Sequence, residues 1–394
     1  PQGWEVKKLE EIANIKGGKR LPKGKNLLDN NTKFAYIRVA DFQDNGTINL
    51  QNIKFINENT YNVLKNYKIY DDNLYISIAG TIGKSGIIPK ELNGAILTEN
   101  AVKLEYIQNN ISNKFMYFFT LSNIFKTQIQ TSTKIVAQPK LAITRLKQIQ
   151  IPLPPLKEQE RIVGILDESF AKIDESIKIL EQDLLNLDEL MQSALQKAFN
   201  PLKDNAKENY KLPQSWEWKS LEEISENISA GGDKPKNCTE SKTAKNQIPV
   251  YANGVNNNGL VGYTDKATII KPSLTISARG TIGFVCIRKE PYFPIVRLIS
   301  LIPCENILCL HYLYFCLNFF IAKGEGSSIP QLTIPKFKSL QIPLPPLKEQ
   351  EQIAEHLDFV FEKAKALKEL YTKELKDYEE LKQSLLNKAF KGEL

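Results

Sequence analysis

The sequence has few of the residues that build metal sites and acid–base pairs. It contains two histidines, His311 and His356. Its five cysteines all lie in the second half, are odd in number and form no CxxC pair (Cys238, Cys286, Cys304, Cys309 and Cys316). We therefore expect reduced, mostly buried thiols and no metal. A site built from Cys309, His311 and Cys316 is the alternative, but the apolar, aromatic sequence around them favours core packing. His356 should lie on the surface of a helix.

Long apolar runs are also missing. The best candidate, LCLHYLYFCLNFFI at 308–321, is shorter than the ~20 residues that a membrane-spanning helix needs. The first residues, PQGWEVKKLEEI, lack the apolar segment of a signal peptide. We therefore expect a cytoplasmic protein with no membrane partner.

The sequence lacks the motifs of nucleotide binding and catalysis that we searched for. GTIGKS at 80–85 resembles the end of a phosphate-binding loop, but the pattern GxxxxGK[ST] requires glycine at the position of Ile78. We find no dinucleotide fingerprint, no Asn-Pro-Pro-aromatic or Asp-Pro-Pro-Tyr methyltransferase tetrad, and no nuclease carboxylate pair followed by lysine. The sequence predicts a chain without catalytic residues, in which Gly80 and Gly83 form a tight turn after a strand.

The chain does contain a long internal repeat. The decapeptide IPLPPLKEQE occurs at 151–160 and again, unchanged, at 342–351. The opening PQGWEVKKLEEI is answered by PQSWEWKSLEEI at 213–224, and ISIAGTIG at 76–83 by ISARGTIG at 276–283. A repeat of this kind indicates a duplicated module, in which one variable globular part precedes one nearly constant tail.

Length and charge follow the same division. A chain of 394 residues normally forms two or three domains. We predict a variable domain at 1–150, a tail at 151–200, a linker at 201–212, a second variable domain at 213–341 and a second tail at 342–394. The variable domains carry 21 basic against 12 acidic side chains and 14 against 10, whereas the tails carry 5 against 10 and 9 against 11. This segregated positive charge favours a polyanionic partner, chiefly nucleic acid.

Each tail is predicted to be one long helix packed in the manner of a coiled coil. Prolines exclude a helix before about Pro155, and Asn200-Pro201 and Lys391-Gly392 should end the two helices. Apolar residues recur at 3–4 spacing, broken only by Gln159, and Leu166, Ile173, Leu180, Leu187 and Ala194 fill the intervening positions. The predicted seam of the first copy consists of Leu156, Val163, Phe170, Ile177, Leu184 and Met191. The second copy keeps a rougher stripe through Leu357, Val360, Ala364, Leu367, Tyr371, Tyr378, Leu381 and Leu385.

Such stripes could instead belong to an ordinary core or to an oligomer. The geometry favours internal pairing, because a helix of about 44 residues spans roughly 66 Å and the linker after it is short. The fold prediction is therefore mixed α/β: two α/β domains separated by two long antiparallel coiled-coil helices, with an internal pseudo-two-fold repeat. Helices of this length would act as a ruler of one to two turns of DNA at ~34 to 36 Å per turn.

Each variable domain shows the same order of local signals. We predict an amphipathic opening helix anchored by Trp4 in the first copy and by Trp216 and Trp218 in the second. A glycine-bearing polar loop follows, and then short strands such as LYISIAG and LTISARG, separated by Asn and Gly turns. An aromatic helical stretch, NKFMYFFTLSNIF or LCLHYLYFCLNFF, comes last. These signals indicate a mixed α/β domain with a curved sheet.

On these residues the sequence resembles the specificity subunit of a type I restriction-modification system. The resemblance covers essentially the whole chain: PLPPLKEQ before a long helix, twice, each time after a domain with an early Trp, a GG loop and a GTIG corner. It implies two target recognition domains that read the halves of a bipartite, gapped double-stranded DNA sequence. It also implies a helical rod that docks two modification (methyltransferase) subunits.

The resemblance further implies where the chemistry lies. The modification partners would bind S-adenosylmethionine and methylate adenine, and restriction (motor-nuclease) subunits, which use ATP, can join them. This chain would hold no cofactor. The rival hypotheses are a structural adaptor whose lobes bind peptides, and a self-sufficient modification enzyme that the absent motifs disfavour.

The candidate DNA-binding residues are cationic, amide, hydroxyl and glycine positions in the polar loops. Lys and Arg would position the phosphates, and Arg or Asn would read base edges in the major groove. The candidates are Lys16, Gly17, Gly18, Lys19, Arg20, Lys23, Lys25, Arg38, Lys84, Lys134, Gly231, Gly232, Lys234, Lys236, Asn253, Arg279, Ser327 and Ser328.

Overall fold

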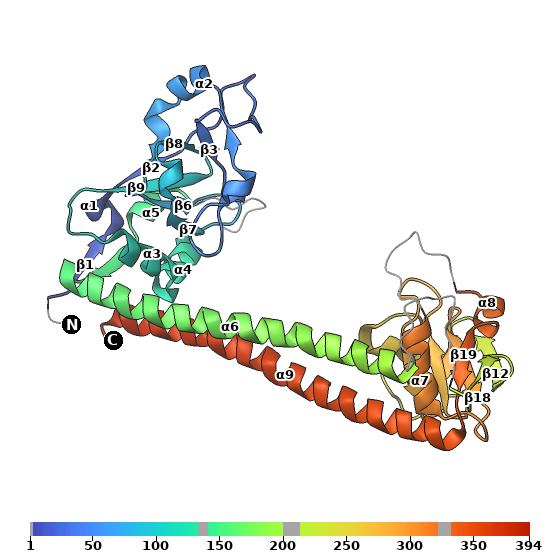
Figure 1. Cartoon of the computed structure of the whole chain (residues 1–394). Coiled ribbons are helices and arrows are strands. Elements are labelled where there is room, and N and C mark those ends of the chain that lie inside the picture. The colour runs from blue at the N-terminus through green and yellow to red at the C-terminus, as the bar shows by residue number, and fades with distance from the viewer. Residues whose placement is uncertain (1–2, 133–140, 200–212, 322–331) are drawn as a thin grey trace. The chain divides into compact units, whose positions relative to one another are not determined.

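A computed structural model describes residues 3–132, 141–199, 213–321 and 332–394 of the chain (Figure 1). The chain forms two compact units. Unit 1 comprises Pro1–Leu180 and Lys373–Leu394, and unit 2 comprises Glu181–Thr372. Each unit therefore contains one α/β domain, a part of the first long helix and a part of the second.

The α/β domain of unit 1 contains three small sheets. The first is an antiparallel sheet in the order β2-β9-β6-β7, formed by Ala13–Gly17, Ala101–Tyr106, Leu74–Ser77 and Ser85–Ile87. The second has the order β4-β3-β8-β5, with β3 and β8 parallel, and is formed by Lys54–Phe55, Ala35–Ile37, Ala95–Leu97 and Lys68–Ile69. The third pairs β1 (Glu5–Lys8) with β10 (Gln150–Leu153).

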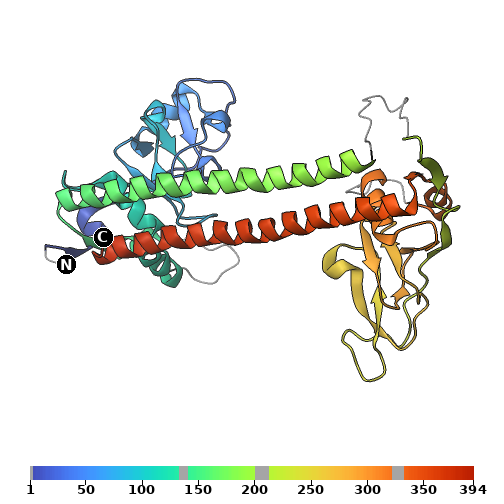
Figure 2. The ribbon, with the colours of Figure 1, turned by 60° about the horizontal axis from the view of Figure 1, so that its bottom comes forward.

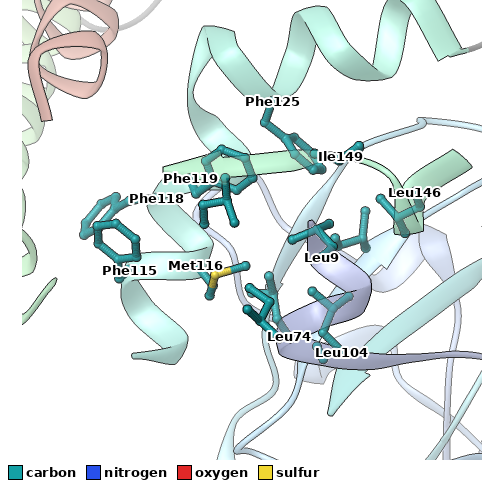
Figure 3. Close-up of a cluster of buried hydrophobic side chains, with 14 of the residues drawn as sticks. Leu9, Leu74, Leu104, Phe115, Met116, Phe118, Phe119, Phe125, Leu146 and Ile149 are labelled. Atoms are coloured by element: carbon teal, nitrogen blue, oxygen red, sulfur yellow. The ribbon is translucent and has the colours of Figure 1, made fainter. Parts of the chain in front are cut away.

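Helices cover one face of the first sheet and complete the core of unit 1. They are α1 (Leu9–Ile12), α3 (Asn113–Leu121), α4 (Asn123–Ser132) and α5 (Ile143–Lys147). A further helix, α2 (Glu58–Val63), packs against the second sheet through Tyr61. The aromatic stretch predicted to be helical is thus confirmed as α3 and α4. Its Phe115, Phe119 and Phe125 are fully buried against Leu74 and Leu104 of the sheet (Figure 3).

Unit 2 repeats this topology. Its antiparallel sheet has the order β12-β18-β15-β16, formed by Ser225–Ala230, Ile299–Pro303, Ser273–Ile276 and Val285–Arg288. A sheet in the order β14-β13-β17 contains Leu260–Thr264, Ile248–Tyr251 and Phe293–Pro294, and β11 (Glu217–Ser220) pairs with β19 (Gln341–Leu344). Its helices are α7 (Leu310–Phe320) and α8 (Ile334–Lys338). The predicted mixed α/β fold and internal repeat are confirmed.

Two long helices run through both units. They are α6 (Leu156–Phe199) and α9 (Leu347–Lys391). Each begins directly after its pair of prolines, as predicted, and α9 ends before Gly392, whose φ of +73° suits a left-handed helix terminus. Among the residues that the structure describes, no helix is long and apolar enough to cross a membrane.

Within each unit the two long helices run antiparallel, as predicted (Figure 2). In unit 1 the early part of α6 lies beside the end of α9, where Asp174 Oδ1 is 2.6 Å from Lys382 Nζ. In unit 2 the later part of α6 lies beside the first half of α9, where Asp188 pairs with Lys368.

The seam between these helices is narrower than predicted. In α6 the buried apolar positions are Ile162, Leu166, Ile173, Leu180, Leu187, Leu195 and Phe199, which confirms the predicted Leu166, Ile173, Leu180 and Leu187. The six predicted positions from Leu156 to Met191 are half-buried and flank this line. In α9, Leu357 and Ala364 are buried, Tyr371, Tyr378 and Leu385 are half-buried, and the inclusion of Leu367 and Leu381 was wrong, because they are 38% and 45% exposed. A two-helix contact buries only a narrow stripe, so Leu367 and Leu381 remain at the surface.

The prediction of an amphipathic opening helix was wrong in both copies. In unit 1 the segment forms β1 and the single turn α1, and in unit 2 it forms β11 and a turn. Residues 5–8 pair in register with Leu153 to Gln150, so ladder bonds to a distant strand override the local helical pattern. Trp216 is buried, and its Nε1 donates to Glu349 Oε1 at 3.0 Å.

The cysteines and histidines of unit 2 are partly as expected. Cys316 packs fully buried in α7, and burial raises the pKa of its thiol well above the ordinary value. The other four cysteines are half-buried free thiols, so the expectation of mostly buried thiols was wrong. His311 Nδ1 lies 2.6 Å from Asp358 Oδ2 of α9, and His356 is exposed on that helix, as predicted. Within the described ranges, no group of three His, Cys, Asp or Glu side chains could hold a metal ion.

Candidate nucleic-acid interface

In unit 2 the predicted loops meet at one place. The glycine loop after β12 lies against the turn that follows β17: the Val296 amide donates to Gly232 O at 2.8 Å, and the Gly231 amide donates to Leu298 O at 2.8 Å. A Cβ atom on Gly231 would lie 2.6 Å from Pro294 C, so only glycine allows this approach. The sequence signal for the GG loop is therefore explained by backbone packing.

Asn253 connects this pair of loops to the GTIG corner. Its Nδ2 donates to Val296 O at 2.5 Å, and its Oδ1 accepts from the Ala278 amide at 2.8 Å. Its amide group is thus used to brace three loops. The next residue after Ala278, Arg279, is exposed to solvent. Asn253 organises the surface on which Arg279 lies.

The glycines of the GTIG corner are confirmed as turn formers. Gly80 and Gly83 have φ of +76° and +88°, and Gly280 and Gly283 have φ of +75° and +82°. Each corner joins the two strands of a hairpin, β6 to β7 or β15 to β16. The corner therefore sets the positions of Lys84 and Arg279, which flank the turn in their hairpins.

Unit 1 brings the equivalent loops together. The Gly18 amide donates to Ala101 O, and the Lys19 amide donates to Leu97 O, both at 2.9 Å. A Cβ atom on Gly18 would lie 2.1 Å from Thr98 O. Here, however, Arg20 Nε lies 2.6 Å from Glu99 Oε1. Burial alone would raise the pKa of Glu99, but the Arg20 guanidinium holds it below its ordinary value.

Arg38 is tied to the interior of its domain. Its Nη2 lies 2.6 Å from Oδ1 of Asp41, whose side chain is only 1% exposed, and also donates to Asn52 O at 3.0 Å. Because this guanidinium holds a buried carboxylate, its first role is structural.

The other cationic candidates differ in their surroundings. Lys16 pairs with Glu105 at 2.6 Å, Lys84 pairs with Asp44 at 2.7 Å, and Lys19 Nζ lies 5.7 Å from the ring centroid of Tyr67. The remaining cationic candidates in the described ranges, Lys23, Lys25, Lys234, Lys236 and Arg279, are exposed. Gly17 ends β2. Lys134, Ser327 and Ser328 lie outside the described residues.

The sequence reasoning missed a buried glutamine at the start of each long helix. Gln159, 1% exposed, accepts from the Ser112 amide at 2.9 Å and donates to Asn110 O at 3.1 Å and Pro154 O at 2.9 Å. Gln350 makes the same three bonds, to the Cys309 amide and to Ile307 O and Pro345 O. The signal was present, because Gln159 was the one polar residue in the seam and it recurs in both copies.

It also missed a set of left-handed residues in unit 2. Of the five non-glycine residues with positive φ in the described part of the chain, four lie in two loops of this domain: Asn257, Asn258, Val296 and Arg297. Positive φ is rare for a β-branched residue such as Val296. The run Asn256-Asn257-Asn258-Gly259 was a readable signal for a left-handed turn.

A comparison with known families now assigns the chain. The model of the type I restriction modification DNA specificity domain matches residues 1–184 and 213–376. The chain belongs to this family. It is a type I specificity subunit, and its two α/β domains are its target recognition domains.

Individual relatives agree with this assignment. The subunit is 29% identical over 357 residues to a putative type I specificity subunit of Mycoplasma pneumoniae, covering 89% of this chain and 87% of that one. It is 24% identical to the putative type I restriction enzyme MjaX specificity subunit of Methanocaldococcus jannaschii, covering 100% and 94%.

Solved structures show the same fold. The HsdS subunit from Thermoanaerobacter tengcongensis matches with a TM-score of 0.63 at 21% identity, covering 100% of this chain and 98% of that one. A chain from a study of complex assembly and conformational transition of the type I R-M system matches with a TM-score of 0.81 at 20% identity, covering 100% and 99%.

The long helices of the specificity subunit carry apolar side chains outside their seam. Leu185 and Leu190 of α6 are 59% and 52% exposed, and Phe359 and Leu370 of α9 are 61% and 55% exposed. In unit 2 a groove of about 590 Å³ lies between the two helices and is lined by residues that include Leu190, Ile353 and Val360. Such exposed apolar surface is typical of protein–protein contact sites.

Proposed function

We propose that this specificity subunit is the non-catalytic DNA-reading component of a type I restriction-modification complex. Each recognition domain reads one half of a bipartite, gapped target in double-stranded DNA. The observation that carries the proposal is the repeated loop cluster: in each domain a glycine loop, a GTIG corner and a third loop meet and leave cationic and amide side chains exposed.

The charge distribution supports a DNA partner. The two domains hold the excess of basic residues, whereas the long helices are acidic. Lysines such as Lys23 and Lys25 in the first domain and Lys234 and Lys236 in the second are exposed and suited to phosphates. Because binding to phosphates releases counterions, affinity should fall steeply with salt.

The exposed apolar positions of α6 and α9 support a protein partner. We assign them, with the groove in unit 2, to the docking of two modification subunits, to which restriction subunits can be added. S-adenosylmethionine and ATP would bind on those partners. The specificity subunit itself would contribute only the recognition of the DNA target sequence.

The experiment that tests the proposal maps adenine methylation across a genome after this chain is expressed with its modification partner. We expect one bipartite motif with a fixed gap, and no methylation when either protein is omitted. A purified complex should bind that motif with an affinity that falls at least ~10³-fold between 50 and 200 mM salt. Salt-insensitive binding, with no DNA retained, would favour the peptide-binding adaptor.

The ruler hypothesis needs its own variant. Deleting seven residues from the middle of both α6 and α9 shortens each helix by about 10 Å and changes the register of its apolar stripe by only ~20°. We expect the preferred gap to shorten by about three base pairs, at 3.4 Å per base step. An unchanged gap in a stably folded variant would refute the ruler.

A further inference from the structure

The hairpin between β13 and β14 in unit 2 ends in an unusual tip. Asn257, Asn258 and Gly259 have φ of +48°, +51° and +79°, so three successive residues are left-handed. A single Asn-Gly step would account for a tight turn, but it does not require a second left-handed asparagine before it. The tip presents a defined shape that the hairpin alone does not need.

A buried arginine holds this tip in place. Arg288 of β16, only 8% exposed, donates from Nη2 to Asn258 O at 2.5 Å and from Nε to Thr275 Oγ1 at 3.0 Å. Its guanidinium lies 3.5 Å from the ring centroid of Tyr251 in β13. Burial of a cation is unfavourable unless its donors are satisfied, so the Asn258 carbonyl and the arginine fix each other.

The asparagine side chains themselves are exposed. Asn256, Asn257 and Asn258 all face solvent, and within the described ranges their amide groups make no hydrogen bond to the protein. The Ala252 amide donates to Gly259 O at 2.8 Å and closes the loop behind them. The backbone is fastened, whereas the side-chain donors and acceptors remain available.

The tip belongs to the loop cluster of the second recognition domain. The same loop starts at Asn253, which bonds to Val296 O and to the Ala278 amide. Val296, left-handed and 55% exposed, and Arg279 therefore lie beside the base of the loop. The loop that carries the exposed asparagines is thus bonded to the segments that carry Arg279 and Val296.

These properties match the direct readout of DNA bases. The major groove admits a two-stranded β-ribbon, and an asparagine amide can pair bidentately with N6 and N7 of adenine. The domain of unit 1 has no such tip among its described residues, where Lys33 is the one non-glycine residue with positive φ. The two domains therefore differ in the backbone conformation of their loops.

We propose that Asn257 and Asn258 read an A·T base pair in the half-site recognised by the second domain, and that Arg288 positions them. This inference rests on the proposed function. It predicts that this loop determines the base preference at one position of one half-site. The first domain would determine the other half-site, and the long helices would determine the gap.

The test uses the specificity subunit in complex with its modification subunits and selects bound DNA from a pool randomised across the mapped target. The variants are Asn257→Gly and Asn258→Gly, singly and together, because glycine keeps the left-handed backbone. Asn257→Asp and Asn258→Asp keep the size but lack the amide donor. The matched control is Asn306→Gly, which changes an exposed asparagine in the turn before α7.

We expect the double glycine variant to lose roughly 5- to 150-fold of its discrimination at one A·T pair, with the second half-site and the gap unchanged. The aspartate variants should lose the adenine preference at the same position, and the control should behave as wild type. The inference is overturned if the folded variants select the wild-type sequence at every position, even with uniformly weaker binding, or if the other half-site changes. If wild type itself selects no bipartite motif, the proposed function fails instead.

Discussion

The contacts that join each α/β domain to the two long helices, here called the joint, are alike in the two units. The loops of the two recognition domains differ. In unit 1, Gln159 in the first turn of α6 bonds to the segment before α3, and the end of α9 packs on α3 through Phe390. In unit 2, Gln350 in the first turn of α9 makes the matching bonds to the segment before α7, and the end of α6 packs on α7 through Phe199. The duplication has therefore kept one joint and used it twice, with the roles of the two helices exchanged.

The loops show the opposite behaviour. Unit 1 has the Arg20–Glu99 ion pair, whereas unit 2 has the left-handed Val296 and Arg297. In both units the glycine loop is bonded to the segment that joins the corresponding strands, β8 to β9 or β17 to β18. A constant joint fixes the orientation of each domain on its helices, and divergent loops change what the domain contacts. We expect variants at the joint to alter stability and variants in the loops to alter preference.

Removing the aromatic anchors of the joints should have the largest effect on stability. Phe199 and Phe390 are 0% and 2% exposed, and each contacts two or more aromatic rings. Phe199→Ala should destabilise unit 2, and Phe390→Ala unit 1, by about 3 to 5 kcal/mol each, because each leaves a cavity. Urea unfolding of the full chain, with a fluorescent probe in each domain, measures both transitions.

The control for this comparison is Phe359→Ala, which removes an α9 phenylalanine that is 61% exposed. Its effect should stay within about 0.5 kcal/mol. If Phe199→Ala shifted the unfolding transitions of both units equally, each joint would not stabilise its own unit alone. That result would contradict the prediction.

Replacing the buried glutamines should have the second-largest effect on stability. Gln159→Ala or Gln350→Ala leaves one buried amide and two carbonyls without a partner, which should cost about 2 to 4 kcal/mol in the affected unit. Gln→Glu should be no milder, because a carboxylate cannot donate to two carbonyls. The exposed Gln192→Ala of α6 is the control. Nearly neutral glutamine variants in the same unfolding assay would show that water replaces these bonds.

Much of this architecture could be predicted from the sequence, because its signals are local or repeated. Pro155 marked the start of α6, Gly392 the end of α9, and the 3–4 spacing the pairing of the two helices. Helix length combined with a short linker was enough to predict the antiparallel direction. The paired GTIG motifs indicated turns, because only glycine suits those backbone angles.

The parts that failed depend on long-range partners. The segment at 5–8 has a helical pattern but pairs with residues 150–153, and Gln159 looked like a defect until its partners at 110 and 112 were seen. Arg38 was predicted to bind DNA because of its charge, but its guanidinium forms an ion pair with the buried Asp41. The left-handed loops were missed because hydrogen bonds from Arg288 and Asn253 hold their backbone angles. These partners are distant in sequence, so no local pattern predicts them.

The smallest effects should come from the ion pairs that join the two helices in each unit. Lys382 pairs with Asp174 in unit 1, and Lys368 with Asp188 in unit 2, while the aspartates are 63% and 62% exposed. Pairs with one solvated partner contribute little, so double-mutant cycles should give couplings of about 0.2 to 1 kcal/mol in each unit. Lys→Met variants keep most of the aliphatic packing, which matters because Lys382 Nζ lies 5.9 Å from the ring centroid of Phe170. In 1 M NaCl, where the screening length is ~3 Å, both couplings should shrink further. A coupling above about 2 kcal/mol that persists in high salt would mean that charge, and not the apolar seam, holds the two helices together in each unit.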